Sequence, residues 1–283
     1  KMGGKQRVPF DRKESKPPKL NEKEIYGIFN EKTYDTREII KRLVDDSEIE
    51  EYKENYGQSI VTCYARVDGW AVGIVANQRT VVKSKKGEMQ FGGVIYSDSA
   101  DKAARFIMNC NQKNIPLVFL QDVTGFMVGS RSEHGGIIKD GAKMVNAMSN
   151  SVVPKFTFVM GNSYGAGNYA MCGKAYDPRL IYAWPSAELA VMSGKSAANT
   201  LLQIEVASLK SKGEEITDEK KKELLDKITK RYDEQTSPYY AAARLWTDGI
   251  IDPLDTRTVI SMGIEMASHE QNVRPYNVGV LQT

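Results

Sequence analysis

The length, composition and charge of this chain are those of an ordinary soluble globular protein. It has 283 residues, of which 41% are hydrophobic and 27% charged, enough for one large domain or two small ones. The formal net charge is only +3, from 39 basic and 36 acidic residues, which argues against nucleic acid or a membrane surface as a partner. No apolar run approaches the roughly 20 residues that span a bilayer, and no signal-peptide pattern opens the chain.

The cysteines indicate the redox environment. Cys63, Cys110 and Cys172 are an odd number, lie far apart and belong to no CxxC or Cys/His pattern. This pattern is not that of a disulfide framework or a zinc site, and it favours a reducing compartment.

The beginning of the chain is predicted to be a linker or arm. Residues 1–23 are rich in Lys, Pro and Gly, a composition that cannot bury a core. Such an arm suggests that another segment preceded it in a parent protein. The first helix is predicted just after Asp35, which can cap it, with Glu38 three positions on.

Two strands joined by a tight turn come next. Apolar runs at residues 60–67 and 70–77 flank Asp68 and Gly69, and an Asp-Gly pair in that position is a strong hairpin signal. The polar residues 78–92 then predict an exposed excursion whose charge run is a solvated loop.

From residue 97 onward, helix and strand patterns alternate. Helices are predicted at 99–111, 136–148 and just after Gly165, and strands at 115–120, 155–160, 180–184 and 188–192. These strands are apolar along their length and joined by helices, which is typical of a buried, largely parallel sheet. Beyond Gly194 the patterns are helical, at 218–235 and 256–269. The predicted fold class is therefore α/β with a helical C-terminal third.

Two glycine-rich turns are the candidate sites. One covers residues 122–129, the other residues 161–167, and each follows a predicted buried strand. Ligands of α/β sheets gather beyond the carboxyl ends of the strands. Glycine lets a ligand approach the main chain closely, and N–H groups at the start of a following helix can stabilise an oxyanion without a side-chain acid or base. Tight packing alone is the other explanation for these glycines.

Other chemistries fit the turns less well. Neither turn has the spacing of a P-loop or a dinucleotide fingerprint. A hydrolase would pair Ser163 with His134, but no convincing acid would orient the histidine. The nearby carboxylates fall at no metal-ligand spacing, so no metal is predicted. Lys139 and Lys143 could attract a phosphate or carboxylate, although a solvated helix face explains them better.

Several long motifs occur in order along residues 24–266. They are IPLVFLQDVTGFMVG (115–129), EHGGIIKDGAK (133–143), VPKFT (153–157), NSYGAGNYAMCG (162–173), WPSAE (184–188) and DGIIDPLDTR (248–257). Together they resemble the carboxyltransferase β subunits of biotin-dependent acyl-CoA carboxylases, in their C-terminal half. Residues 164–169, 172–173 and 184–185 and the helix at 218–235 lean towards the 3-methylcrotonyl-CoA type, which is related to the propionyl-CoA enzymes.

The resemblance implies a fold and a reaction. The fold is the crotonase-type ββα superhelix over residues 24–270, followed by a tail at 271–283. The reaction moves a carboxyl group from N-carboxybiotin on a carrier protein to the α-carbon, or vinylogous γ-carbon, of a short acyl-CoA such as 3-methylcrotonyl-CoA or propionyl-CoA. The ureidate that remains would take the proton from that carbon, so no side-chain base is required.

The resemblance also assigns site residues. Family members hold two oxyanions with two pairs of main-chain N–H groups, and the C-terminal half serves the biotin side. The matching positions for oxyanion stabilisation are Gly125, Phe126, Gly165, Ala166 and Gly167. The biotin-binding set consists of Gly125, Phe126, Gly165 and Ala166 with the neighbouring Thr124 and Tyr164.

The family's acyl-CoA-binding N-terminal half is not in this sequence. It is expected either in a removed part of a longer chain or in a separate polypeptide. Further expected partners are a biotin carboxylase and biotin carrier subunit and further copies in a homo-oligomer, commonly a hexamer, in bacterial cytoplasm or the mitochondrial matrix. The alternatives are the carboxyltransferase subunit of a glutaconyl-CoA decarboxylase and a non-catalytic assembly half that docks the biotin carrier.

Overall fold

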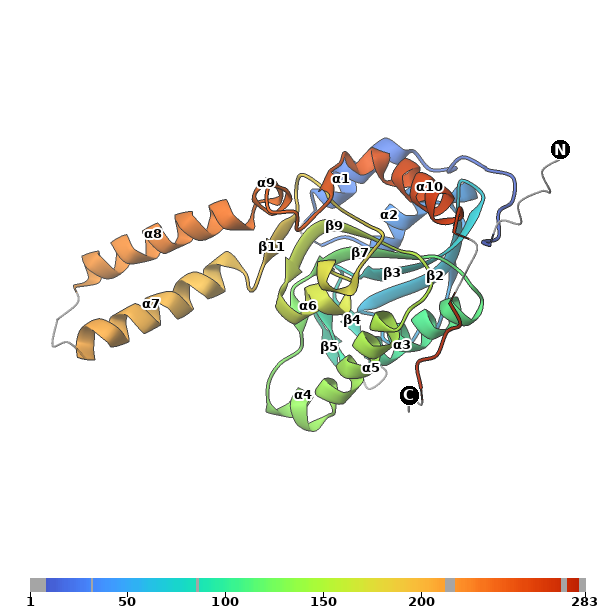
Figure 1. Cartoon of the computed structure of the whole chain (residues 1–283). Coiled ribbons are helices and arrows are strands. Elements are labelled where there is room, and N and C mark those ends of the chain that lie inside the picture. Colours follow the sequence, from blue (N-terminus) through green and yellow to red (C-terminus); the bar gives the residue numbers. More distant parts are fainter. Residues whose placement is uncertain (1–8, 32, 85–86, 212–216, 271–273, 280–283) are drawn as a thin grey trace.

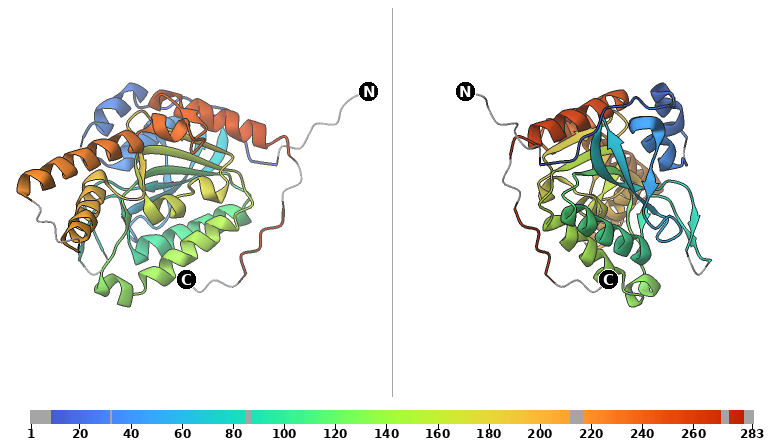
Figure 2. Two further views of the ribbon diagram at one scale, coloured as in Figure 1. Left: turned by 60° about the vertical axis from the view of Figure 1, so that its left-hand side comes forward. Right: turned by 90° about the vertical axis from the view of Figure 1, so that its right-hand side faces the viewer.

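The fold is built around one twisted sheet covered by helices on both faces (Figures 1 and 2). The computed structural model describes residues 9–31, 33–84, 87–211, 217–270 and 274–279. The rest of the predicted arm (1–8) and of the predicted tail (271–273 and 280–283) lies outside the described residues. In the described part, no helix is both long and apolar enough to cross a bilayer.

The main sheet has eight strands in the order β1-β2-β3-β7-β9-β10-β12, with β11 also paired to β9. Its strands are β1 (Glu50–Glu51), β2 (Ile60–Val67), β3 (Trp70–Asn77), β7 (Leu117–Val123), β9 (Lys155–Tyr164), β10 (Leu180–Ala183), β11 (Glu188–Ala190) and β12 (Gly249–Ile250). Pairing is antiparallel from β1 to β3 and parallel from β3 to β12. The predicted buried and largely parallel sheet is thus confirmed, since every residue of β7 is buried.

Two small sheets lie beside the main one. β4 (Val82–Lys83) pairs with β5 (Met89–Gln90), and β6 (Val94–Ile95) pairs in parallel with β8 (Gly125–Phe126). The predicted exposed excursion is confirmed for most of the described residues of 78–92, among which only Gln78 and Gln90 are buried. Gln78 is fully buried, and its amide is satisfied there, since it accepts from Thr36 N at 3.1 Å and donates to Asp35 at 2.7 Å.

Helices form a layer on each face of the sheet. They are α1 (Ile25–Phe29), α2 (Thr36–Leu43), α3 (Ser97–Gln112), α4 (Ser130–His134), α5 (Ile137–Ser149), α6 (Gly165–Ala170), α7 (Gly194–Ser211), α8 (Asp218–Thr236), α9 (Pro238–Ala242) and α10 (Thr256–Ala267). α1, α2 and α10 cover one face, and α3 and α5 the other (Figure 2). Along β7, Val118 belongs to the core under the first layer and Phe119 to the core under the second, as strand alternation requires.

Local sequence signals placed several elements correctly. Asp68 and Gly69 both have positive φ, +50° and +81°, which is the turn that an Asp-Gly hairpin needs. Asp35 caps α2 by accepting from Arg37 N at 3.0 Å. Glu38 does not reach back to complete a capping box, because it pairs with Arg42 at 2.9 Å and Lys41 at 3.2 Å.

The strands at the candidate site run further than predicted. β7 continues to Val123 and β9 to Tyr164, where Val123 pairs with Ser163 and β11 pairs with residues 162–164. Residues 161–164 are therefore strand, and α6 begins at Gly165 with no intervening loop. The predicted second turn is in fact a direct strand-to-helix junction, held by partners on both sides.

The described part of the N-terminal arm packs on the domain, contrary to its composition. Phe10 is 5% exposed and belongs to the core. Arg12 stacks over Trp70, with its guanidinium carbon 4.5 Å from the ring centre. In its described residues, the arm thus packs against the start of β3. At the other side of the molecule, α7 and α8 project from the body as a helical hairpin (Figure 1).

Candidate active site

The two glycine turns, which come from different strands, touch one another. A Cβ built on Gly167 would lie 3.1 Å from Gly125 Cα and 2.6 Å from Val123 Cγ2. Only a residue without a side chain permits this approach with the neighbours as they stand. The sheet brings them together because β7 and β9 are adjacent and parallel, so that their carboxyl ends meet at one edge.

The first turn is clamped onto β6. Thr124 N donates to Gly93 O at 2.8 Å and Met127 N donates to Ile95 O at 2.9 Å, on either side of Gly125 and Phe126. Gly125 has φ +142°, in the region that only glycine adopts readily. The Thr124 hydroxyl also donates to Gly93 O, at 3.1 Å, so this side chain helps to hold the turn.

The second turn starts a helix. Gly165 has φ +49°, and a Cβ there would lie 2.8 Å from Val191 O, so the residue that follows β11 lies against the junction. The first N–H groups of an α-helix have no i−4 acceptor and carry the positive end of its dipole. Ala166 in this first turn is exposed, whereas Gly167 is buried between the turns.

An open groove lies beside these N–H groups. It has a volume of about 420 Å³ and runs between β8, α5 and α6. Its lining is mainly apolar and includes Phe126, Met127, Ile137, Ile138, Ala166 and Tyr169. Ile138 is 73% exposed on a helix whose neighbouring Ile137 faces the core. The exposure of Ile138 gave no signal in the sequence, because adjacent isoleucines on a helix can also both be buried, as Ile39 and Ile40 are in α2.

The structure does not bring Ser163 and His134 into a catalytic pair. Ser163 is 1% exposed, and its hydroxyl donates to Gln121 Oε1 at 2.6 Å and accepts from Asn168 Nδ2 at 2.6 Å. His134 is exposed in α4. Ser163 is thus a buried link between β7, β9 and α6, which is not the geometry of a nucleophile beside its base.

Tyr164, beside the second turn, and two buried cysteines elsewhere in the fold have raised pKa values. Tyr164 donates its phenol hydrogen to Glu188, and burial together with this carboxylate raises the pKa of Tyr164 well above its ordinary value. Burial raises the pKa of Cys172 to about 11 and that of Cys110 to about 12. These groups therefore carry no negative charge at neutral pH and cannot serve there as bases.

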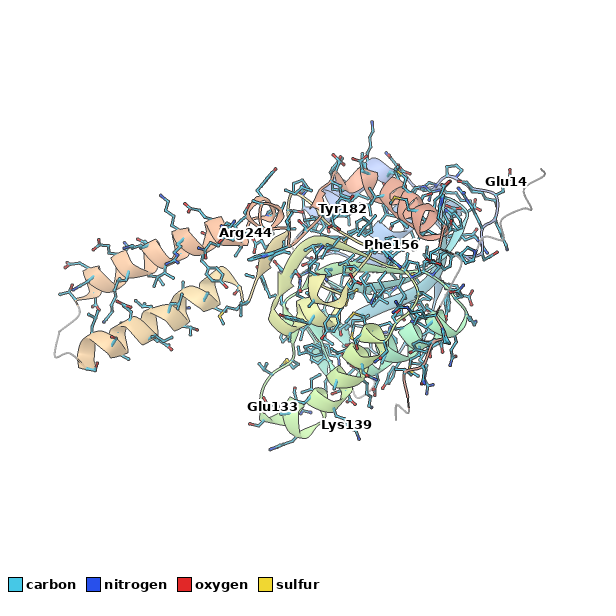
Figure 3. All side chains as sticks on the ribbon, viewed as in Figure 1. Glu14, Glu133, Lys139, Phe156, Tyr182 and Arg244 are labelled. Carbon is cyan, nitrogen blue, oxygen red and sulfur yellow. The ribbon has the colours of Figure 1, made fainter. Side chains whose placement is uncertain are left out.

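The two lysines of α5 differ from one another. Lys143 Nζ lies 3.0 Å from Asp101 and 2.9 Å from Asp140, so its charge is already paired. Lys139 is exposed near the start of α5, and Glu133 lies close to it in sequence, near the end of α4 (Figure 3). Neither position favours the phosphate or carboxylate site considered from sequence. Over the described ranges, no cluster of His, Cys, Asp or Glu has the grouping of a metal site.

Comparison with known proteins identifies the family. The model of the carboxyl transferase domain matches residues 4–278, which is nearly the whole chain. The chain belongs to the carboxyl transferase domain family. The predicted membership in the carboxyltransferase β subunits of biotin-dependent acyl-CoA carboxylases, and with it the crotonase-like fold, is confirmed.

The relatives give the degree of similarity. The chain is 45% identical over 253 residues to a probable mitochondrial methylcrotonoyl-CoA carboxylase beta chain of Drosophila melanogaster, covering 88% of this chain and 41% of that protein. It is 44% identical over 263 residues to the biotin-dependent 3-methylcrotonyl-coenzyme A carboxylase beta1 subunit of Mycobacterium tuberculosis, covering 92% and 47%. The chain thus spans less than half the length of these relatives.

Solved structures agree with the fold. The β subunit of geranyl-CoA carboxylase from P. aeruginosa superposes with a TM-score of 0.78 at 35% identity, over 96% of this chain and 50% of that one. The transcarboxylase 12S, described as a hexamer assembly with methylmalonyl-coenzyme A bound, has a TM-score of 0.78 at 37% identity, over 94% and 48%.

Proposed function

We propose that this chain provides the biotin-facing half of a carboxyltransferase. In this reaction a carboxyl group moves from N-carboxybiotin on a carrier protein to a short acyl-CoA. The N–H groups of Gly125 and Phe126, with those of Gly165, Ala166 and Gly167, would stabilise the negative charge on the ureido oxygen of biotin. Oriented donors in a site that excludes water favour developing charge strongly, which is the role we assign to both turns.

The observation that carries this proposal is the meeting of two backbone turns beside an apolar groove. Biotin is an apolar bicyclic ring with one strongly accepting ureido oxygen, so it needs an apolar wall and main-chain donors at one end. Phe126 and Ala166 belong to both the groove and the turns, and Thr124 and Tyr164 flank them. The buried Ser163 and the protonated Tyr164 leave the ureidate of biotin as the proton acceptor in this proposal.

A second half is required in this proposal. The relatives are about twice as long as this chain, and the acyl-CoA side of the site would come from the remaining length of such a protein or from a separate polypeptide. A biotin carboxylase with its biotin carrier would supply the carboxylated cofactor. We further propose a hexamer, as in the transcarboxylase 12S, within bacterial cytoplasm or the mitochondrial matrix.

For the acyl group we propose 3-methylcrotonyl-CoA before propionyl-CoA. The two relatives above at 44–45% identity are named for methylcrotonyl substrates, whereas the methylmalonyl-CoA carboxyltransferase 12S subunit of Propionibacterium freudenreichii is 39% identical.

The test is ATP-dependent carboxylation of 3-methylcrotonyl-CoA by the full-length assembled protein with its biotin carrier. We expect Ala166→Phe to abolish transfer, because the ring would fill the groove that Ala166 lines. We expect the same of Gly165→Phe, because a Cβ at Gly165 meets Val191 O at 2.8 Å and must displace the junction that holds the N–H groups. Gly27→Phe is the control, since a side chain at that position meets nothing within 4 Å. Full activity in both turn variants would contradict the oxyanion assignment and favour an assembly module that only docks the carrier.

A decarboxylase is the second candidate. The alpha subunit of a methylmalonyl-CoA decarboxylase from Propionigenium modestum is 36% identical over 86% of this chain. This alternative predicts acyl-CoA decarboxylation that requires sodium and a membrane partner, with no dependence on ATP. The carboxylase proposal predicts the opposite dependence.

The hydrolase alternative predicts labelling of Ser163 by a serine-directed probe, and we expect none.

A further inference from the structure

A buried carboxylate lies directly behind the two turns. Asp122, at the end of β7, is 4% exposed. Its Oδ2 accepts from the Tyr34 hydroxyl at 2.7 Å and its Oδ1 accepts from Asn162 N at 2.9 Å. Its own N–H donates to Asn77 Oδ1 at 3.2 Å. One residue thus connects the ends of β3, β7 and β9 with the segment before α2.

The carboxylate also determines how closely β9 approaches β7. A Cβ built on Gly161 would lie 2.7 Å from Asp122 Oδ1, so the carboxylate rests on the backbone of Gly161. Three residues separate Gly161 from Gly165, and two separate Asp122 from Gly125. A displacement of this contact would therefore be transmitted along two short, stiff strand ends to both sets of N–H groups.

Arg79 supplies the charge that balances Asp122. Its Nε is 3.1 Å from Asp122 Oδ2, while Nε and Nη1 have no hydrogen-bond partner among the described residues. Its Nη1 also packs against Gly93, whose carbonyl accepts from Thr124 N in the first turn. Burial raises the pKa of Asp122, whereas Arg79, Tyr34 and the Asn162 N–H favour its charged form. Removing the carboxylate would leave a buried guanidinium without its counter-charge.

We propose that Asp122 is a positioning residue that sets the distance between the two glycine turns and so aligns their N–H groups on one oxygen. The inference rests on the proposed function of the turns. Asp122 does not itself reach the groove, because its carboxylate is covered by Gly161, Tyr34 and Arg79. It acts only through the backbone that it holds.

The molecule contains a matched control at the opposite end of β3. Asp45 is 7% exposed and accepts from the N–H groups of Asp68 and Gly69, each at 2.8 Å. It also accepts from Arg257 Nη2 at 2.7 Å. Asp45 is therefore a second buried aspartate with two close donors and an arginine, but it holds a hairpin turn and not a candidate site.

The experiment compares Asp122→Ala, Asp122→Asn and Asp45→Ala in the full-length assembled protein with its biotin carrier. We expect Asp122→Ala to lower kcat about 100-fold with the KM for acyl-CoA unchanged, because misplaced donors affect the transition state. Asp122→Asn keeps an acceptor for Asn162 N and should retain about tenfold more activity than Asp122→Ala. Asp45→Ala should lower the melting temperature while kcat stays at the wild-type value.

Equal kcat in Asp122→Ala and wild type would overturn the inference, as would an equal loss of kcat in Asp45→Ala. If Asp122→Ala does not assemble, Asp122→Asn and Tyr34→Phe decide the question. Both should then reduce kcat without a change in KM, and wild-type kcat in both contradicts a positioning role. A wild-type protein without transfer activity would instead contradict the proposed function, so the two failures are distinguishable.

Discussion

The two ends of the sheet each contain a buried aspartate–arginine pair, and the pairs differ in how well they are satisfied. At the hairpin end, Arg257 donates to Leu43 O, Lys16 O and Asp45, at 2.8, 2.8 and 2.7 Å. At the turn end, Arg79 leaves Nε and Nη1 without hydrogen bonds in the described structure. Buried polar groups are usually satisfied, and exceptions gather where backbone geometry serves a function. The comparison suggests that the hairpin end serves stability and the turn end serves activity.

The largest expected difference in activity is between variants of two glycines, Gly125 in the first turn and Gly263 in α10. We predict that Gly125→Val lowers carboxyl transfer about 100-fold, because a β-branched residue cannot keep φ at +142° and the Phe126 N–H must move. Its matched control is Gly263→Ala in α10, where a Cβ would lie 2.6 Å from Phe156 Cε1. That variant should lose about 1–3 kcal/mol of stability with kcat unchanged. Steady-state kinetics and thermal unfolding of both variants measure the contrast.

The hairpin end should respond to loss of its arginine mainly through stability. We predict that Arg257→Met lowers the free energy of unfolding by about 3–5 kcal/mol, because Asp45 would stay buried without its cation. Denaturant unfolding measures the change. An Arg257→Met variant that is as stable as wild type would contradict the proposed stabilising role of the hairpin end. So would a variant that is fully folded but has a lowered kcat.

A variant of Lys102 tests whether a buried cation without hydrogen-bond partners, like Arg79 at the turns, always indicates a functional site. It belongs to α3, is 1% exposed, and its Nζ has no hydrogen-bond partner in the described residues. Burial lowers the pKa of Lys102 from 10.5 to about 8, so charging this amine in the folded state opposes folding. The destabilisation is full below pH 8 and fades as pH rises towards 10.5.

Lys102→Met should therefore stabilise the protein at pH 7, by on the order of 3 kcal/mol, and leave transfer activity unchanged. The gain should shrink when unfolding is measured at pH 8, 9 and 10. Lys23→Met, at an exposed lysine, should show no such trend. A gain that is constant with pH would show that methionine packing and not the lost charge is responsible.

The smallest effect is expected at Ser163, inside the turn region but not at its donors. Ser163→Ala should cost about 1–3 kcal/mol of stability, because Gln121 and Asn168 lose a buried partner. Transfer activity should persist. Complete loss of activity in a folded variant would return Ser163 to consideration as a reacting group.

The features that were predicted correctly are those that depend on residues close together in the sequence. The Asp68-Gly69 turn, the amphipathic helices and the positions of both glycine turns follow from residues close together in the chain. Asp68 adopts a positive φ because the hairpin twist requires it, and that requirement is visible in two letters of sequence.

Long-range pairing accounts for what was missed. Residues 161–164 were assigned to a turn, but β7 and β11 flank them and complete a strand, and these partners are 26 to 40 residues away. The role of Asp122 depends on Tyr34 and Arg79, which are more than 40 residues earlier and carry no periodic signal. The arm was judged by its composition, but Phe10 belongs to the core and Arg12 stacks over Trp70.

The most direct test of the oxyanion assignment is a structure of the full-length assembled protein with biotin on its carrier. We predict that the ureido oxygen lies about 3 Å from main-chain nitrogens of both turns, among them Phe126 N and Ala166 N, with the bicyclic ring against the groove. A ureido oxygen held by side chains elsewhere, with the two turns empty and facing away, would contradict it.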